Sequence, residues 1–260
     1  MPTRPHEQRA VAESFGTDVE RYDRARPDYP PALIERIVAA LPGPDVLDVG
    51  CGTGISARQF RAAGCRVLGL DVDERMLGPA RSSGLAVEVG AFEDWDPAGR
   101  TFDAVVSGQA WHWVDPERGA AAAARVLRPD GRFAAFWNVF LPPPELDTAF
   151  TAVYARVLPD LPFPGAGTSL LAVYERGLVQ VAEHLRAAGF AESEQWRADH
   201  EVRYTRDEWL DVVPSFGGMG TLPADTLAEL LAGLGAAVDA AGGAFTMTYA
   251  AVALTATRPA

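Results

Sequence analysis

Three closely spaced glycines, Gly50, Gly52 and Gly54, occur in the stretch VLDVGCGTG. Glycines without side chains let a ligand approach the main chain closely, and a helix that begins after such a turn presents free N–H groups. Asp71 follows 21 positions after Gly50, where its carboxylate can accept hydrogen bonds from both hydroxyls of a ribose. Together these residues predict a site for an adenosine-containing ligand rather than a turn that binds nothing.

The spacing of the glycines distinguishes between two such ligands. The dinucleotide fingerprint is G-x-G-x-x-G, whereas here position 55 is Ile55 and the third glycine falls one place early at Gly54. Asp48, just before the turn, adds a negative charge where a pyrophosphate would lie. A negative charge suits an ammonium or a sulfonium far better than a pyrophosphate. We therefore expect S-adenosylmethionine, and no metal, as the cofactor.

The elements that must position these residues follow an α/β pattern. Residues 45–138 alternate short apolar or β-branched runs with helical segments, which is typical of a parallel sheet covered by helices on both faces. The expected strands are Val46–Val49, Arg66–Asp71, Ala86–Val89, Phe102–Ser107 and Gly131–Trp137. Ligands of such open sheets bind at the carboxyl ends of the strands. Both the glycine turn and Asp71 stand at such ends.

The remaining residues are expected to complete the sheet and to cover its edge. Residues 9–41 predict an irregular arm followed by a helix that begins near Pro30, and Thr205 with Glu208 predicts a capping box. Two later strands are expected within 194–204 and 245–257. We expect one domain made of an N-terminal arm and helix (1–44), a cofactor-binding core (45–138), a helical insertion or cap (139–193) and the C-terminal part of the sheet (194–260).

Composition excludes several classes of protein. Of the 260 residues, 48% are hydrophobic and 22% are charged, which excludes intrinsic disorder, and no apolar stretch is long enough to cross a bilayer. The net charge of −12 disfavours nucleic acid and anionic membranes as partners. With two cysteines, four histidines and no signal-like N-terminus, we expect a cytoplasmic protein without a metal site.

Four segments, LDVGCGTG, GLDVDERML, GAFEDW and FDAVVSGQAWHWVD, give the chain a family resemblance. Over residues 45–137 it resembles the class I S-adenosylmethionine-dependent methyltransferases. The stretches RARPDYP and AWHWVD are similar to a small-molecule branch that contains trans-aconitate-type carboxyl methyltransferases and natural-product enzymes. The resemblance implies a Rossmann-like doubly wound sheet of seven strands in the order 3-2-1-4-5-7-6 with the last strand antiparallel.

The resemblance also implies which residues bind the cofactor. Gly50, Cys51 and Gly52 would pack against the methionyl part, with Asp48 near its ammonium group and Asp71 on the ribose. The adenine ring and the methionine backbone would contact Val72, Met76, Ala91, Phe92, Glu93 and Ser107. A solvated turn in which Asp94 or Asp96 caps the next segment remains an alternative for Glu93 and Asp94.

The N-terminal arm offers two further cofactor residues, Tyr22 and Arg26. Arg26 can pair with the methionine carboxylate, because a guanidinium binds carboxylates through two hydrogen bonds. A surface ion pair of Arg26 with Asp23 or Asp28 is an equally good interpretation of the same residues. Cys51 is expected to be a small packing residue and not a nucleophile.

His112 is the candidate catalytic residue, because it follows the fourth strand at the expected ligand-binding edge. It can act as a general base or donate a hydrogen bond to an acceptor carboxylate. The alternative is a histidine bonded to backbone that orients its neighbours; His6, His184 and His200 are assigned to surface or packing roles. The expected acceptor-binding residues, for which core packing or a plain loop is the alternative, are Trp111, Trp113, Trp137, Phe140, Phe216 and Met219.

We therefore expect an S-adenosylmethionine-dependent methyltransferase that acts on a small molecule at a carboxylate or hydroxyl oxygen. Displacement at a sulfonium methyl needs mainly alignment of the acceptor atom, and an acceptor that is already ionised needs no base. The alternatives are methylation of RNA or protein, and a cofactor-binding regulator without catalysis.

Overall fold

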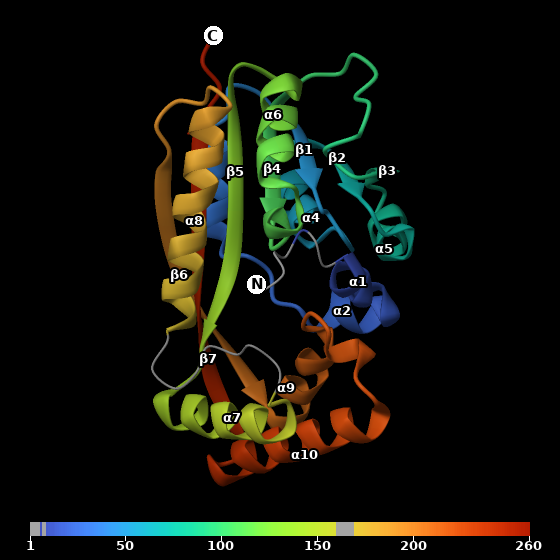
Figure 1. Ribbon diagram of the computed structural model, residues 1–260, viewed down its shortest axis with the longest axis vertical. Helices are drawn as coiled ribbons and strands as arrows, with labels where there is room; N and C mark the ends of the chain where they lie inside the picture. The colour runs from blue at the N-terminus through green and yellow to red at the C-terminus, as the bar shows by residue number, and fades with distance from the viewer. Residues whose placement is uncertain (1–5, 7–8, 160–168) are drawn as a thin grey trace.

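The computed structural model describes residues 6, 9–159 and 169–260, and its centre is a seven-stranded sheet in the order β3-β2-β1-β4-β5-β7-β6 (Figure 1). Strands β1 to β5 pair in parallel, and β7 is antiparallel to both of its neighbours, β5 and β6. The strands are β1 Asp45–Val49, β2 Arg66–Asp71, β3 Ala86–Val89, β4 Phe102–Gly108, β5 Leu127–Leu141, β6 Glu194–Thr205 and β7 Ala244–Thr257. The predicted fold class and strand order are confirmed.

Each face of the sheet is covered by its own helices. Successive residues of a strand point to opposite faces, so Val46 and Leu47 of β1 belong to two different apolar clusters. The Val46 side packs against α3 Pro31–Ala39 and α4 Ile55–Ala62, and the Leu47 side against α6 Pro116–Val126 and α8 Leu170–Ala187. Burial on both faces explains why these short strands are almost continuously apolar.

Local capping explains where several helices begin. Asp115 accepts hydrogen bonds from the N–H groups of Glu117 and Arg118, and Pro116 stands at the first position of α6. Thr205 and Glu208 form the expected capping box of α9 Arg206–Val212. The residue types alone predict these helix starts.

The strand β5 is longer than expected at both ends. Residues 128–131, with the sequence RPDG that favours a turn, form part of β5, because Leu127 already pairs with Phe102 of β4 and the pairing resumes at Arg132 after an irregularity. Asp130, with φ +62°, donates its N–H to the Arg258 carbonyl within this irregularity. The residues are of turn type, but hydrogen bonds of Asp130 and Gly131 with Arg258 keep them alongside the end of β7.

The N-terminal arm is helical, so the expectation of an irregular arm was wrong. It comprises α1 Arg9–Ala12, the 3-10 turn η2 Glu13–Thr17 and α2 Val19–Ala25. Isolated helices this short are unstable in water, so tertiary contacts must hold them. Arg24 of α2 pairs with Asp211 of α9, and Asp23 pairs with Arg58 of α4. Sequence periodicity cannot detect helices of one or two turns.

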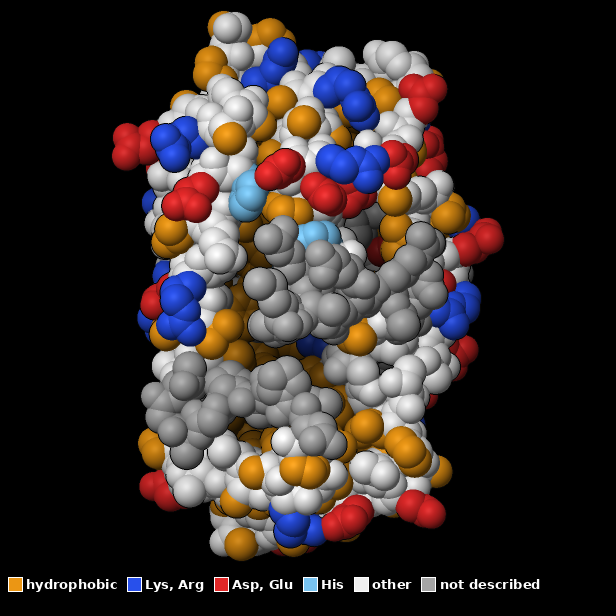
Figure 2. Space-filling model, in the orientation of Figure 1, with side chains coloured by type: hydrophobic (Ala, Val, Ile, Leu, Met, Phe, Trp, Pro, Cys, Tyr) orange, Lys and Arg blue, Asp and Glu red, His pale blue; other side chains and the backbone are white. Residues whose placement is uncertain are grey.

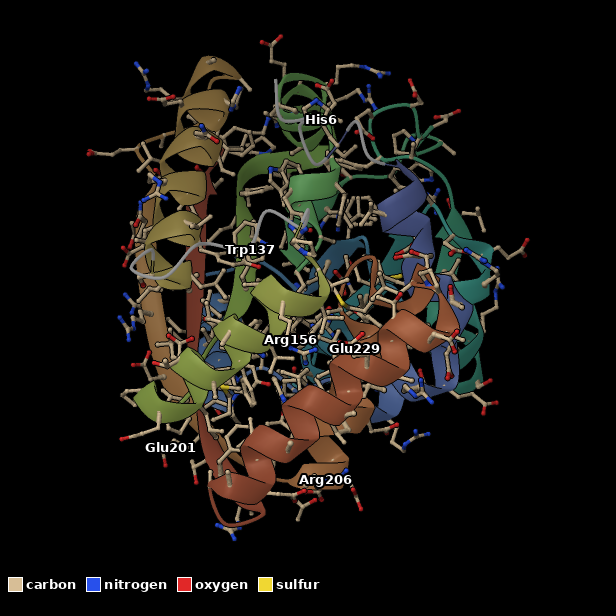
Figure 3. All side chains as sticks on the ribbon, turned by 60° about the horizontal axis from the view of Figure 1, so that its bottom comes forward. His6, Trp137, Arg156, Glu201, Arg206 and Glu229 are labelled. Carbon is tan, nitrogen blue, oxygen red and sulfur yellow. The ribbon has the colours of Figure 1, made fainter. Side chains whose placement is uncertain are left out.

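A third group of helices lies at the carboxyl end of β5, below the sheet in Figure 1. It comprises α7 Pro144–Val157, α9 and α10 Ala224–Ala240, with two 3-10 turns, η5 Val213–Ser215 and η6 Met219–Thr221. Their apolar faces form a separate cluster with the nearby ends of β6 and β7. Arg156 of α7 and Glu229 of α10 face each other as an ion pair (Figure 3). The expected loop after α7 falls largely in 160–168, outside the described residues.

No helix within the described residues combines the length and the apolar character that a bilayer span requires.

The carboxyl ends of β1, β2 and β4 face a hollow between the sheet and the third helical group. The candidate site lies in this hollow.

Candidate functional site

A cavity of about 920 Å³ lies at this edge, between the sheet, the N-terminal arm and the third helical group. Figure 2 shows a depression on this face with hydrophobic side chains along its walls. One part of the wall, which we call the glycine-turn half, contains Gly50, Gly52, Asp71, Val72, Met76, Ala91 and Phe92. The other part, the aromatic half, contains Phe140, Phe150, Tyr154, Tyr174, Trp209, Phe216 and Tyr249.

The glycine turn has a backbone that other residues adopt at a cost. Gly50, Gly52 and Gly54 have φ values of +70°, +51° and +88°, in the left-handed region that favours glycine. A side chain at Gly50 would place its Cβ 2.3 Å from the Cβ of Ala110. The turn therefore passes tightly against the loop after β4, and its main chain borders the cavity directly.

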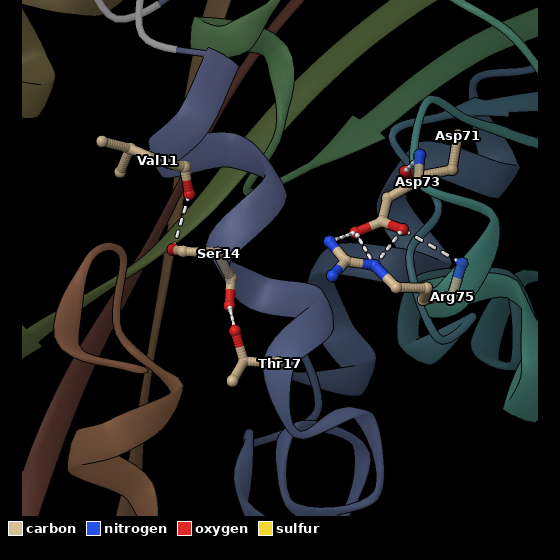
Figure 4. Close-up of polar contacts among 6 residues, drawn as sticks. All are labelled: Val11, Ser14, Thr17, Asp71, Asp73 and Arg75. Carbon is tan, nitrogen blue, oxygen red and sulfur yellow. Dashed lines mark hydrogen bonds and ion pairs between the residues drawn. The ribbon is translucent and has the colours of Figure 1, made fainter. Parts of the chain in front are cut away.

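Asp71 is held in one orientation by two backbone groups. Its Oδ2 accepts from the Gly52 N–H at 2.8 Å and its Oδ1 from the Asp73 N–H at 2.9 Å. Burial raises the pKa of the Asp71 carboxyl, and these two hydrogen bonds limit the rise. Figure 4 shows the adjacent pair of Asp73 and Arg75 beside the N-terminal segment. Asp71 thus presents a fixed carboxylate on the cavity wall.

Asp48 lies behind the turn, fully buried and not on the cavity wall. Its Oδ2 accepts from Ser56 Oγ at 2.6 Å, whereas its Oδ1 has no partner among the described residues. Burial raises the pKa of Asp48 to about 7, and the nearby charge of Asp71 adds to the rise. A buried carboxyl group with an unpaired oxygen is stabilised by a cation, so its chemistry fits the ammonium that the sequence predicts for this position.

Cys51 and Ser107 also lie behind the wall. Cys51 fills the space beside Gly69, where a side chain on that glycine would place its Cβ 2.6 Å from the sulfur, and burial raises the pKa of the Cys51 thiol. Ser107 Oγ donates to the Val49 carbonyl at 2.8 Å. The structure therefore does not bring these two side chains into the cavity; they pack and hold the turn from below.

The residues expected around the adenine ring do line the cavity. They are Val72, Met76, Ala91, Phe92 and Glu93. Glu93 also accepts the backbone N–H of Asp115 at 2.6 Å, so it anchors the start of α6. Asp94 pairs with Arg118, and Asp96 accepts the Ala98 N–H, so the capping alternative describes Asp96.

His112 lies on the cavity wall in the 3-10 turn η4 Trp111–Trp113. Its Nδ1 accepts the indole N–H of Trp137 at 3.1 Å, which assigns the remaining proton of the neutral ring to Nε2. Burial lowers the pKa of His112 to about 4. The imidazole is therefore neutral near pH 7 with its lone pair already engaged, so it can donate a hydrogen bond but is poorly placed to remove a proton.

The expected acceptor-binding residues divide into two groups. Trp113, Phe140, Phe216 and Met219 line the cavity. Trp111 and Trp137 do not: Trp111 packs edge-on against Phe133 with ring centres 4.5 Å apart, and Trp137 lies behind His112. For these two tryptophans the core-packing alternative describes the structure, because Trp111 in η4 and Trp137 within β5 both belong to the apolar cluster between the sheet and its helices.

The N-terminal arm supplies Tyr22 and Arg26 to the wall. Arg26 donates through Nη2 to the Ser215 carbonyl at 2.6 Å, and its guanidinium carbon lies 4.8 Å from the ring centre of Phe216. Asp23 is taken by Arg58, and Arg26 has no carboxylate partner within residues 9–159 and 169–260. The interpretation of Arg26 as part of a surface ion pair is therefore wrong.

Several wall residues were missed by the sequence interpretation. His6, assigned to a surface or packing role, lies on the wall, as do Gln109 and Asn138, whose side-chain oxygens lack partners in the described part of the chain. Gln109 has φ +58°, a conformation that is uncommon outside glycine and tends to occur at functional sites. Trp209 and Tyr249 were also missed, because no local spacing links them to the glycine turn.

Comparison with known proteins agrees with this geometry. The family model "Methyltransferase domain" matches residues 47–135. An uncharacterized methyltransferase of Mycobacterium tuberculosis is 38% identical over 133 residues, covering 50% of this chain and 54% of that protein, so the chain spans about half the length of this relative. Nocamycin O-methyltransferase of Saccharothrix syringae is 34% identical over 241 residues, covering 82% of this chain and 85% of that protein.

A solved structure shows the same architecture. A protein from Anaeromyxobacter dehalogenans described as a type II methyltransferase superposes with a TM-score of 0.64 at 26% identity, covering 90% of this chain and 98% of the other. The sheet order, the glycine turn and the Asp71 carboxylate at the end of β2 are together typical of doubly wound proteins that bind nucleosides. The chain belongs to the class I S-adenosylmethionine-dependent methyltransferases.

Proposed function

We propose that this protein transfers the methyl group of S-adenosylmethionine to an oxygen of a small organic acceptor. The observation that carries the proposal is one continuous cavity whose glycine-turn half offers the groups that bind the nucleoside and whose aromatic half has room for a second molecule. The continuity of the two halves means that two ligands can meet without leaving the protein.

The residues of the glycine-turn half fit the cofactor. Asp71 would accept the ribose hydroxyls, the main chain at Gly50 and Gly52 would contact the methionyl part, and Val72 with Met76 would enclose the adenine ring. The unpaired Oδ1 of Asp48 supports a cation near the turn. Arg26, which lacks a carboxylate partner among the described residues, would bind the methionine carboxylate. The bound cofactor supplies an electrophilic methyl group on a sulfonium.

Oxygen as the methylated atom is supported by His112. A neutral imidazole that presents Nε2–H toward the cavity can hold an acceptor oxygen, whereas an amine acceptor would need a hydrogen-bond acceptor there. The relative that aligns over most of both chains is named an O-methyltransferase. The charge of −12 disfavours RNA and supports a small molecule as the acceptor.

The remaining work of the site is positioning and exclusion of water. The aromatic half surrounds the acceptor with apolar rings, and the N-terminal arm covers the cavity through Phe15, Tyr22 and Arg26. An oxygen that is already ionised, such as a carboxylate or an acidic enol, needs no base. This agrees with a His112 whose lone pair is engaged by Trp137.

The test is a methyl-transfer assay with S-adenosylmethionine carrying a deuterated methyl group and a panel of small carboxylic acids, phenols, enols and amines. Mass spectrometry should find labelled esters or ethers with the wild-type protein, and clearly less of them with Asp71→Ala when the cofactor is limiting. Label found only on nitrogen would overturn oxygen as the methylated atom. Absence of transfer to any panel member, with S-adenosylhomocysteine still bound in calorimetry, would overturn the proposed catalysis in favour of a cofactor-binding regulator.

A further inference from the structure

A buried indole N–H without a partner lies in the aromatic half. Trp209 on α9 is 1% exposed, lines the cavity, and has no hydrogen-bond partner for Nε1 among the described residues. A buried donor that loses its hydrogen bond to water is costly, so native proteins rarely keep one unless a ligand or a water molecule satisfies it. The N–H of Trp209 therefore points to a group that enters the cavity.

The surroundings of Trp209 are aromatic rings, which are at most weak acceptors. Phe150 stacks on it with ring centres 5.6 Å apart, and Phe216 meets it edge-on at 5.9 Å. The nearby hydroxyls of Tyr204 and Tyr249 are hydrogen-bonded to each other at 2.9 Å. The indole N–H of Trp209 therefore remains an unpaired donor surrounded by aromatic rings.

Other tryptophans of the chain behave differently. The indole N–H of Trp95 donates to Glu88 at 2.8 Å, that of Trp137 donates to His112, and that of Trp196 donates to Glu194. The fold therefore provides a partner for each of these three indoles, and the unpaired N–H of Trp209 occurs on the wall of the cavity.

The position of Trp209 separates it from the expected site of methyl transfer. His112 lies two residues after Ala110, which touches the glycine turn, whereas Trp209 belongs to the third helical group. Phe140 and Phe216, stacked with ring centres 5.4 Å apart, both contact Trp209. A molecule that reaches from His112 to Trp209 along these rings must be flat and apolar between its polar ends.

We propose that Trp209 Nε1–H binds an oxygen of the methyl acceptor that is remote from the methylated oxygen. The acceptor is thus a planar, unsaturated molecule with a carbonyl or ring oxygen on the side away from the cofactor. This inference rests on the proposed function, because it takes the aromatic half to be the place of the acceptor.

The test compares two planar probes of equal ring number in the protein loaded with S-adenosylhomocysteine. 7-Hydroxycoumarin carries a hydroxyl and a remote carbonyl, whereas 2-naphthol carries the hydroxyl alone. We expect 7-hydroxycoumarin to bind the wild-type protein more tightly and to shift the indole N–H signal of Trp209 downfield in ¹H–¹⁵N spectra. Trp209→Phe, which keeps an aromatic ring, should weaken 7-hydroxycoumarin about five- to tenfold and leave 2-naphthol almost unchanged.

Trp95→Phe is the matched control, since Trp95 does not line the cavity and its indole N–H already has Glu88 as a partner. It should leave the affinity for both probes unchanged, and thermal melting of both variants shows whether each one folds before its affinity is compared. The comparison of the two probes in the wild-type protein stands even where Trp209→Phe does not fold.

Equal affinity for the two probes, or no saturable binding of 7-hydroxycoumarin, would overturn the inference. Calorimetry with S-adenosylhomocysteine on the same samples separates the role of Trp209 from the function of the protein. Normal cofactor binding with failed probe binding rejects only the role of Trp209, whereas a wild-type protein that does not bind S-adenosylhomocysteine rejects the proposed function itself.

Discussion

The two halves of the cavity are built in different ways. The glycine-turn half consists of loops at the ends of neighbouring strands, and the groups proposed to bind the cofactor are main-chain atoms and one carboxylate, Asp71, held by main-chain N–H groups. The aromatic half consists of side chains from β5, α7, α8, α9 and β7, which lie far apart in the sequence. A short segment of sequence thus supplies the wall of the glycine-turn half, whereas tertiary packing brings together the wall of the aromatic half.

The difference predicts how each half responds to substitution. A glycine with a positive φ value, or one that lies close to another segment, tolerates few substitutions, because the backbone there cannot adjust to a new side chain. Apolar side chains can be exchanged at moderate cost when their volume is conserved. Changes in the glycine-turn half should therefore weaken cofactor binding, whereas changes in the aromatic half should alter the choice of acceptor.

Gly50→Ala should have the largest effect on cofactor affinity. Its Cβ would meet the Cβ of Ala110 at 2.3 Å, and its φ is +70°, so we expect affinity for S-adenosylhomocysteine to fall about 100-fold, or roughly 2.7 kcal/mol. Gly64→Ala is the control, because Gly64 has φ +94° with nothing within 4 Å of the added Cβ. It should cost about 1 kcal/mol of folding stability and leave the affinity unchanged. Equal losses of affinity for S-adenosylhomocysteine in the two variants, measured by calorimetry, would contradict the role of the close approach to Ala110.

Asp71→Ala should weaken S-adenosylhomocysteine at least about tenfold, because charge-assisted hydrogen bonds worth roughly 1.5 kcal/mol or more are lost. Asp71→Asn tests the charge, since the amide keeps the shape and one acceptor oxygen. We expect an intermediate loss for Asp71→Asn in the same titration. Wild-type affinity in Asp71→Ala would refute the ribose assignment.

Substitutions of His112 separate a hydrogen-bond donor from a general base. His112→Gln keeps an N–H group near the position of Nε2, so turnover should stay within about threefold of wild type, whereas His112→Leu should lose about tenfold. Since burial lowers the pKa of His112 to about 4, wild-type turnover should show no His112 titration between pH 5.5 and 8. A glutamine variant as slow as the leucine variant, with an inflection in that pH range in the wild type, would restore the general base.

The effect of Asp48→Asn on folding stability should be smallest at low pH and should grow as the pH rises. The pKa of Asp48 is raised to about 7 in the folded protein, so its contribution to stability is fully present below the unfolded pKa and is lost as pH rises toward 7. The neutral variant lacks this loss. The free energy of unfolding of Asp48→Asn should therefore rise relative to that of the wild type by up to about 1.4 kcal/mol per pH unit between pH 4 and 7. Chemical denaturation that shows a constant difference would contradict ionisation of a buried Asp48.

The fold could be predicted to a large extent because its signals are local. Buried parallel strands are apolar runs, and caps such as Asp115 with Pro116 mark helix starts regardless of the rest of the chain. The helical N-terminal arm was missed because α1 and α2 are too short to show periodicity. They exist through ion pairs such as Arg24 with Asp211, which join residues that only the fold brings together.

The sequence by itself determined the glycine turn and Asp71 at the end of the next strand, because these depend on backbone conformation and residue spacing, whereas the order of the sheet followed from the family resemblance. Only the tertiary structure decided that Trp111 and Trp137 pack in the core, that Trp137 occupies the lone pair of His112, and that Trp209 lies on the cavity wall. The direction of a side chain at the end of a strand is set by what packs against it, and in this protein those partners come from segments more than twenty residues away.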